Sequence, residues 1–63
     1  MGNYEARITL ENGLILSEKF DEYADMCRWL ALNGEAGIAA YDIDAGAPID
    51  QAQLQQDVTA YQG

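Results

Sequence analysis

The sequence predicts a single small α+β domain over residues 1–63, with the element order ββαβα. Three features support this fold class: an early stretch that alternates apolar and polar residues, an Asn-Gly turn signal directly after it, and a later stretch with apolar residues at helical spacing. We expect a three-stranded antiparallel sheet in the order 2-1-3, with one helix packed on one face and a second helix at the C-terminal end.

The first two strands are predicted to form a hairpin over residues 4–20. Apolar side chains occupy every second position of the first strand, at Tyr4, Ala6, Ile8 and Leu10. Period two is typical of a strand with one buried face. Asn12 and Gly13 follow, and this pair favours a type I′ turn, whose two central residues both need positive φ. A second strand is then expected from Leu14 to about Lys19 or Phe20.

A helix is predicted to follow over roughly residues 22–32. Its apolar stripe is formed by Tyr23, Met26, Cys27, Leu30 and Ala31. Asp21 is expected to be the N-cap, because its carboxylate can accept from the first exposed amides of the helix. Gly34 is expected to end the helix in the left-handed conformation.

The C-terminal half is predicted to add a third strand and a second helix. The strand covers Gly37–Ile43, and residues 44–48 are expected to form a loop. Asp50 is expected to cap the second helix, with Gln53 at its third position. A right-handed crossover makes strand three parallel to strand two, which places it beside strand one and gives the order 2-1-3.

The charge is strongly unbalanced, with eleven acidic residues, three basic residues and no histidine, for a net charge of -8. Such a surface repels nucleic acids and anionic membranes and attracts basic proteins. Without histidine the most common general base is missing. Cys27 stands alone on an apolar stripe, where a thiol usually packs as a small hydrophobe. We therefore predict a protein that is not an enzyme and that needs no cofactor or metal.

No apolar run in the sequence approaches the length of about 20 residues that a membrane-spanning helix needs. Its first residues have neither the basic start nor the apolar core of a signal peptide. A cytoplasmic protein with a reduced thiol is the expectation.

The candidate partner-binding residues are two acidic groups and one aromatic residue. They are Glu18, Asp21, Glu22, Asp25, Trp29, Asp42 and Asp44. The carboxylates would steer the encounter with a basic protein surface, and Trp29 would be the apolar anchor. The alternatives are that the acids only keep the protein soluble and that Trp29 widens the core.

In its overall character the chain resembles the small acidic antagonists encoded by phages, among them anti-CRISPR proteins and DNA mimics. The likeness consists of the size, the excess of acids, and the hairpin over residues 4–20 followed by the helix from Asp21. The resemblance implies stoichiometric inhibition of a nucleic-acid-handling complex. These antagonists share no common motif, so the resemblance does not assign a function to any residue of this chain.

The leading hypothesis is a binding protein whose acidic surface occupies a basic, nucleic-acid-binding site on a host protein. The alternative is a small homodimeric structural or regulatory subunit without nucleic-acid mimicry, in which open strand edges pair across a two-fold axis. A third possibility is a metal-dependent activity through Asp42 and Asp44.

Overall fold

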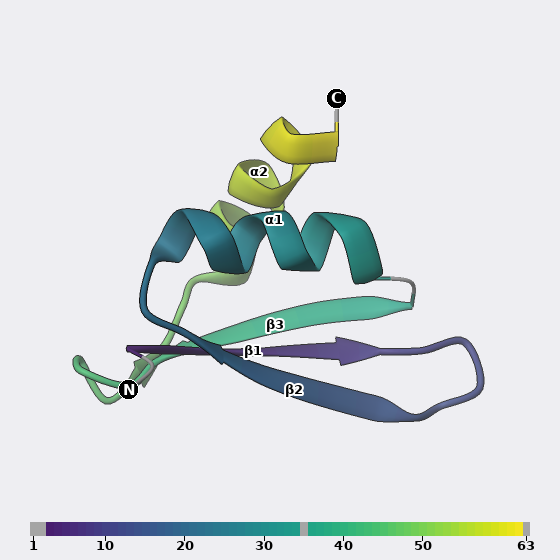
Figure 1. Cartoon of the computed structure of the whole chain (residues 1–63), viewed down its shortest axis with the longest axis horizontal. Coiled ribbons are helices and arrows are strands. Elements are labelled where there is room, and N and C mark those ends of the chain that lie inside the picture. The colour runs from purple at the N-terminus through teal and green to yellow at the C-terminus, as the bar shows by residue number, and fades with distance from the viewer. Residues whose placement is uncertain (1–2, 35, 63) are drawn as a thin grey trace.

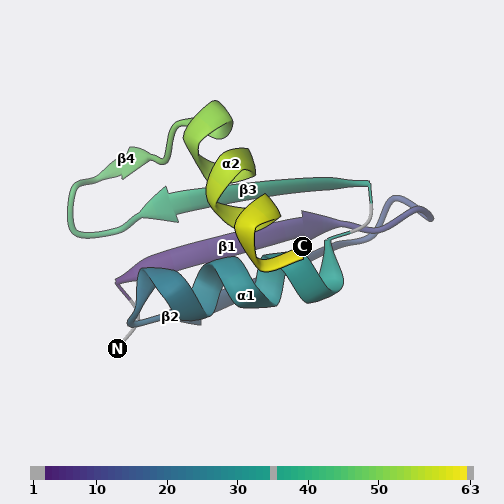
Figure 2. The same cartoon turned by 90° about the horizontal axis from the view of Figure 1, so that it is seen from above.

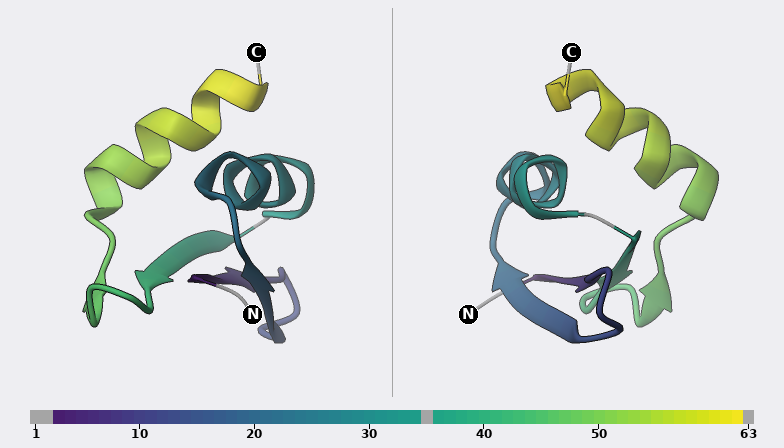
Figure 3. Two further views of the ribbon diagram at one scale, coloured as in Figure 1. Left: turned by 60° about the vertical axis from the view of Figure 1, so that its left-hand side comes forward. Right: turned by 90° about the vertical axis from the view of Figure 1, so that its right-hand side faces the viewer.

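The computed structural model describes residues 3–34 and 36–62 of the chain. The elements are, in order, β1 (Tyr4–Thr9), β2 (Ile15–Phe20), α1 (Tyr23–Asn33), β3 (Gly37–Asp42), β4 (Ala47–Pro48) and α2 (Gln51–Gln62). The strands form one antiparallel sheet in the order β2-β1-β3-β4. Both helices lie on the same side of this sheet (Figure 1 and Figure 3). The α+β class and the order of the first three strands are thus as predicted, whereas the fourth strand was not expected.

The hairpin forms where predicted, but its turn is of a different type. Gly13 has a φ of 89°, while no residue other than glycine has a positive φ in the described chain. Asn12 therefore cannot be in a type I′ turn, and the loop has three residues between the paired Leu10 and Leu14. The side chain of Asn12 accepts a hydrogen bond from the backbone N–H of Leu14 at 3.0 Å. This Asx-type contact stabilises the loop, and a three-residue loop of this kind needs only one residue with positive φ, which is Gly13.

The two ends of α1 differ from the sequence prediction. The N-cap position is Glu22, which makes no side-chain capping hydrogen bond, so Asp21 is not the cap. At the other end Gly34 has a φ of -68° and lies in the extended region, so the predicted left-handed stop is wrong. Gly34 is needed for space instead: a Cβ there would lie 2.6 Å from the side chain of Ile38 and 2.8 Å from the carbonyl oxygen of Leu30.

The segment between β3 and α2, predicted as a loop, contains the two-residue strand β4 at the edge of the sheet. Pro48 pairs with Tyr41 of β3, and it is tolerated there because an edge strand leaves one row of N–H positions unused. A strand of two residues has no detectable period, which is why the sequence pattern could not indicate it. Asp50 caps α2 as predicted, accepting from the N–H of Gln53 at 3.0 Å.

The core lies between the sheet and the two helices and is formed by few side chains. The buried residues are Ala6, Ile8, Met26, Cys27, Leu30, Ala40, Leu54 and Val58. Seen from above, α1 lies along β1 and β2, and α2 crosses over β3 towards α1 (Figure 2). Leu54 and Val58 dock α2, so the mostly polar second helix is packed within the domain. Neither of these two helices covers the opposite face of the sheet (Figure 3).

The tight packing at Gly34 leads to a prediction. Gly34→Ala should lower the free energy of unfolding by about 1–3 kcal/mol, because the new methyl group meets backbone as well as a side chain. Gly37→Ala is the matched control: its Cβ would find ordinary contacts of 3.7 and 3.8 Å with Thr9 and should be nearly neutral. Urea denaturation of both variants measures the difference, and equal stabilities would contradict the steric argument.

Candidate binding surface

The sheet order brings the two predicted acidic groups to the same end of the molecule. Tyr4, at the start of β1, pairs with Phe20 at the end of β2 and with Asp42 at the end of β3. The connection from β2 to α1 and the turn from β3 to β4 therefore flank the start of β1 (Figure 1). Neighbouring strands are about 4.8 Å apart, so β2 and β3 lie about 10 Å apart across β1. We call this region the acidic end, formed by Glu18, Asp21, Glu22, Asp25, Asp42 and Asp44.

The first group of the acidic end is exposed around the start of α1. Asp21 and Glu22 lie in the connection before the helix, and Asp25 lies in its first turn. A carboxylate in the first turn is favourable because the helix dipole is positive there. Asp25 also lies 4.0 Å from Arg28, and both side chains are more than half exposed. An ion pair so exposed contributes little to stability, which leaves both groups able to exchange partners.

Two further residues of the acidic end, Asp42 and Asp44, have different roles in the β3–β4 turn. Asp42 is half-buried, and its Oδ1 accepts the backbone N–H of Ala45 at 3.1 Å. This contact stabilises the turn, so Asp42 has a local structural task. Asp44 is exposed within the turn. The carboxylates of Glu18, Glu22 and Asp44 make no hydrogen bond or ion pair with any other described residue.

Trp29 is half-buried and lies partly in the core. Its ring centroid is 5.6 Å from that of Phe20, with a tilt of 51° between the two rings. This contact joins α1 to β2. Leu32, one turn further along the same side of α1, is 78% exposed and is the most exposed large apolar side chain among the described residues.

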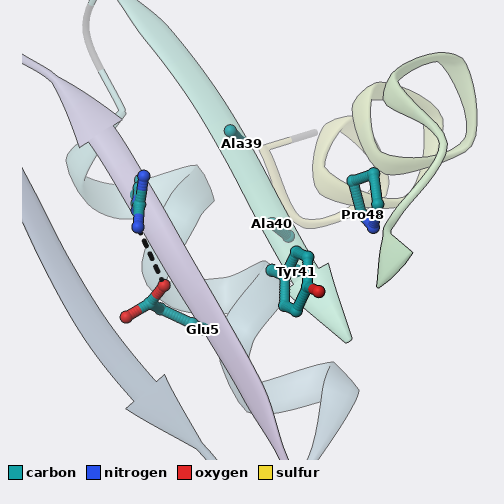
Figure 4. Close-up of a pocket in the computed structure, with 6 residues that line it drawn as sticks. Glu5, Ala39, Ala40, Tyr41 and Pro48 are labelled. Atoms are coloured by element: carbon teal, nitrogen blue, oxygen red, sulfur yellow. Dashed lines mark hydrogen bonds and ion pairs between the residues drawn. The ribbon is translucent and has the colours of Figure 1, made fainter. Parts of the chain in front are cut away.

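The uncovered face of the sheet has a different chemical character from the acidic end. Alternation and register place Glu5, Arg7 and Lys19 on this face, which therefore carries two of the three basic residues of the chain. The guanidinium of Arg7 forms an ion pair with the carboxylate of Glu5, with 3.3 Å between Nη2 and Oε1. A shallow hollow of about 350 Å³ lies beside this ion pair, with Tyr41 and Pro48 on its other side (Figure 4). The hollow is open to solvent.

A polar contact that sequence reasoning missed joins the two helices. The hydroxyl of Tyr23 on α1 donates to Oδ2 of Asp57 on α2 at 2.5 Å, and Gln53 donates to the other oxygen at 3.0 Å. Burial, followed by the hydrogen bond to Asp57, raises the pKa of Tyr23 above its usual range. The only available signal was the position of Asp57 next to Val58 and one turn after Leu54, on the apolar side of α2.

Cys27 lies beside this contact and is 1% exposed. Burial raises the pKa of its thiol; the hydrogen bond with Tyr23 acts in the opposite direction, and the negative charge of Asp57 raises the pKa again. The thiol is therefore protonated and inaccessible at neutral pH, the opposite of what a nucleophilic cysteine requires.

The described part of the chain contains neither a cluster of metal ligands nor a helix that could span a membrane. No three cysteine or acidic side chains of residues 3–34 and 36–62 come close enough together to hold a metal ion. Neither helix is long and apolar enough to cross a membrane. Comparison of the chain with models of protein families, with curated proteins and with solved structures finds no match.

The Tyr23–Asp57 contact gives a prediction for stability at neutral pH. Tyr23→Phe should lower the free energy of unfolding by about 1 kcal/mol, because it removes a hydrogen bond and leaves the Asp57 oxygen less well satisfied. Tyr61→Phe, at an exposed position that lines a small hollow together with Tyr23 and Asp57, should change stability little. Thermal or urea unfolding compares the two, and an equal loss in both would rule out the specific contact.

The same region gives a prediction for alkaline pH. Tyr23 and Cys27 both have folded pKa values above their ordinary ones. In the unfolded chain each group loses its proton earlier, so the stabilisation is complete below about pH 8.5 and is lost as the pH rises beyond the usual thiol and phenol values. Stability measured from neutral to strongly alkaline pH should fall, and Tyr23→Phe should reduce the slope of that fall. An unchanged slope in Tyr23→Phe would contradict the assignment.

Proposed function

We propose that this chain is a non-enzymatic binding protein whose acidic end occupies a basic, nucleic-acid-binding surface of a host protein or complex, and that it acts as a stoichiometric inhibitor of the anti-CRISPR or DNA-mimic kind. The observation that carries the proposal is the meeting of two acidic groups, about 20 residues apart in the sequence, at one end of the sheet. A lysine- or arginine-lined site that binds phosphates attracts carboxylates by the same charge.

The arrangement of the acids supports this proposal over a purely solubilising role. Three acidic residues have local tasks, because Asp42 holds a turn, Asp50 caps α2 and Asp57 joins the helices. Three others at the acidic end have none within the described chain: Glu18, Glu22 and Asp44. Like charges close together disfavour the folded state, so a cluster without internal partners is a cost that an external cation can offset.

The available chemistry also favours binding over catalysis. The sequence has no histidine, and the lone thiol is buried and protonated. The described pockets are open and shallow, whereas acid–base chemistry by two carboxylates needs a site that shifts one pKa by burial. A surface that works through charge and shape is the function that this set of residues suits best.

The test is capture of partners from a bacterial lysate by the immobilised chain at low salt. The captured proteins should be nucleic-acid-binding proteins, and they should be released both by a salt step and by added duplex DNA, because both compete for the same cations. Capture that survives moderate salt, or that duplex DNA does not affect, would contradict the proposal.

Matched variants locate the interaction. Glu22→Gln at the acidic end should weaken binding of the captured partner about two- to fivefold. Glu11→Gln, the same substitution in the hairpin loop at the opposite end of the sheet, should have a smaller effect. The triple variant Glu18→Gln, Glu22→Gln, Asp44→Asn should abolish capture with the fold intact, because these carboxylates hold nothing within the described chain. Equal effects of the two single variants would show that only the net charge matters.

A further inference from the structure

The two edges of the sheet differ in how well they are protected from pairing with another strand. The β4 edge is only two residues long and includes Pro48, which has no N–H to offer. The β2 edge is six residues long, and five of its six residues are exposed. Short strands and proline are the usual ways to block an edge, so the fold protects one edge and leaves the other open.

The hydrogen-bond pattern shows which groups of β2 face outward. The N–H of Leu10 donates to the carbonyl oxygen of Leu14 at 2.8 Å, which identifies these two residues as a hydrogen-bonded pair. Such pairs alternate along an antiparallel ladder, so residues 16, 18 and 20 of β2 also bond to β1. The N–H and C=O groups of Ile15, Ser17 and Lys19 therefore point away from the sheet.

We propose that this edge is a self-association surface, on which β2 of a second copy pairs in antiparallel orientation about a two-fold axis at Ser17. In that register Ser17 faces Ser17 of the second copy, and Ile15 faces Lys19 of the second copy. All six outward groups of each strand are then satisfied. A two-fold axis perpendicular to the sheet also keeps both pairs of helices on one face, which makes the sheet continuous over eight strands.

The side chains fit this register. On the helix side, Leu16 lies opposite Glu18 of the second copy, and Leu14 lies opposite Phe20 of the second copy. No two like charges face each other directly, whereas an axis at Glu18 would oppose two glutamates. A second copy is therefore a better occupant than an arbitrary strand, because this sequence complements itself.

The pairing also covers apolar surface that one copy leaves in water. Leu14, Ile15 and Leu16 are consecutive and exposed, and Ile15 is 62% exposed. Trp29 contacts Phe20 at the end of β2, and Leu32, three residues further along α1, is 78% exposed. Exposed large apolar groups that gather along one unpaired edge are typical of an interface.

The dimer goes beyond the proposed function and is compatible with it. The antiparallel arrangement would carry the rest of each acidic end, from Asp21 onward, to opposite sides of the axis, where it is open to a partner, whereas Glu18 lies beside the axis on the helix side. Each copy has a net charge of -8, so the copies repel each other at long range. Added salt screens this repulsion and should strengthen the dimer, although it weakens capture of a basic partner. The salt dependence thus separates the two proposals.

The experiment is sedimentation equilibrium of the purified full chain at micromolar concentration in low and moderate salt. We expect a species of twice the 6.9 kDa mass of one chain, with a larger dimer fraction at moderate salt. Ser17→Lys and Ser17→Asp each place like charges opposite one another and should weaken association about tenfold or more. Gln56→Lys, which makes the same charge change as Ser17→Lys on the exposed side of α2, should leave association unchanged.

Mixing Ser17→Lys with Ser17→Asp makes the test specific, because unlike charges then meet at the axis. The mixture should recover dimer, and this recovery also shows that both variants are folded. A wild-type chain that stays monomeric under all conditions would overturn the proposal. Failure of the mixture to associate would overturn it as well. A third contradicting result is a wild-type chain that is monomeric and a Ser17→Lys variant that no longer captures the partner, because the edge would then bind a strand of another protein.

Discussion

The packing of α1 between the sheet and α2 is the contact on which the rest of the structure depends. Met26, Cys27 and Leu30 are almost fully buried and link the central strands to the second helix. Small side chains at Ala6 and Ala40 let the helices approach the middle of the sheet. A chain of this length has only a few core residues to offset its conformational entropy, so each of these contacts contributes a large share of the stability. The close approach at Gly34 belongs to the same packing.

Much of the fold could be predicted from local patterns in the sequence. Strict alternation located β1, helical spacing located α1, and the handedness of crossovers placed β3 beside β1. The errors have local causes. Asn12 and Gly13 indicated a turn but not its type, because that depends on the number of residues in the loop. Gly34 looked like a left-handed stop, but tertiary packing and not backbone conformation requires it.

The candidate site was predicted residue by residue but not as a geometry. The sequence showed acids near the start of α1 and after β3, and the register then placed both groups beside the start of β1. It could not show that Asp42 is occupied with a turn or that Trp29 lies partly in the core against Phe20. Side-chain hydrogen bonds and ring contacts between distant elements leave no periodic signal. For the same reason the Tyr23–Asp57 contact was found only in the structure.

The burial of Cys27 has a practical consequence for anyone who works with this protein. A thiol reagent can reach the sulfur only when the helices separate from the sheet. The rate of alkylation under native conditions therefore measures how often the domain opens. The chain thus contains its own chemical reporter of this opening. This reporter needs no engineered label. The factor by which a bound ligand slows the alkylation would measure how strongly the ligand stabilises the domain against opening.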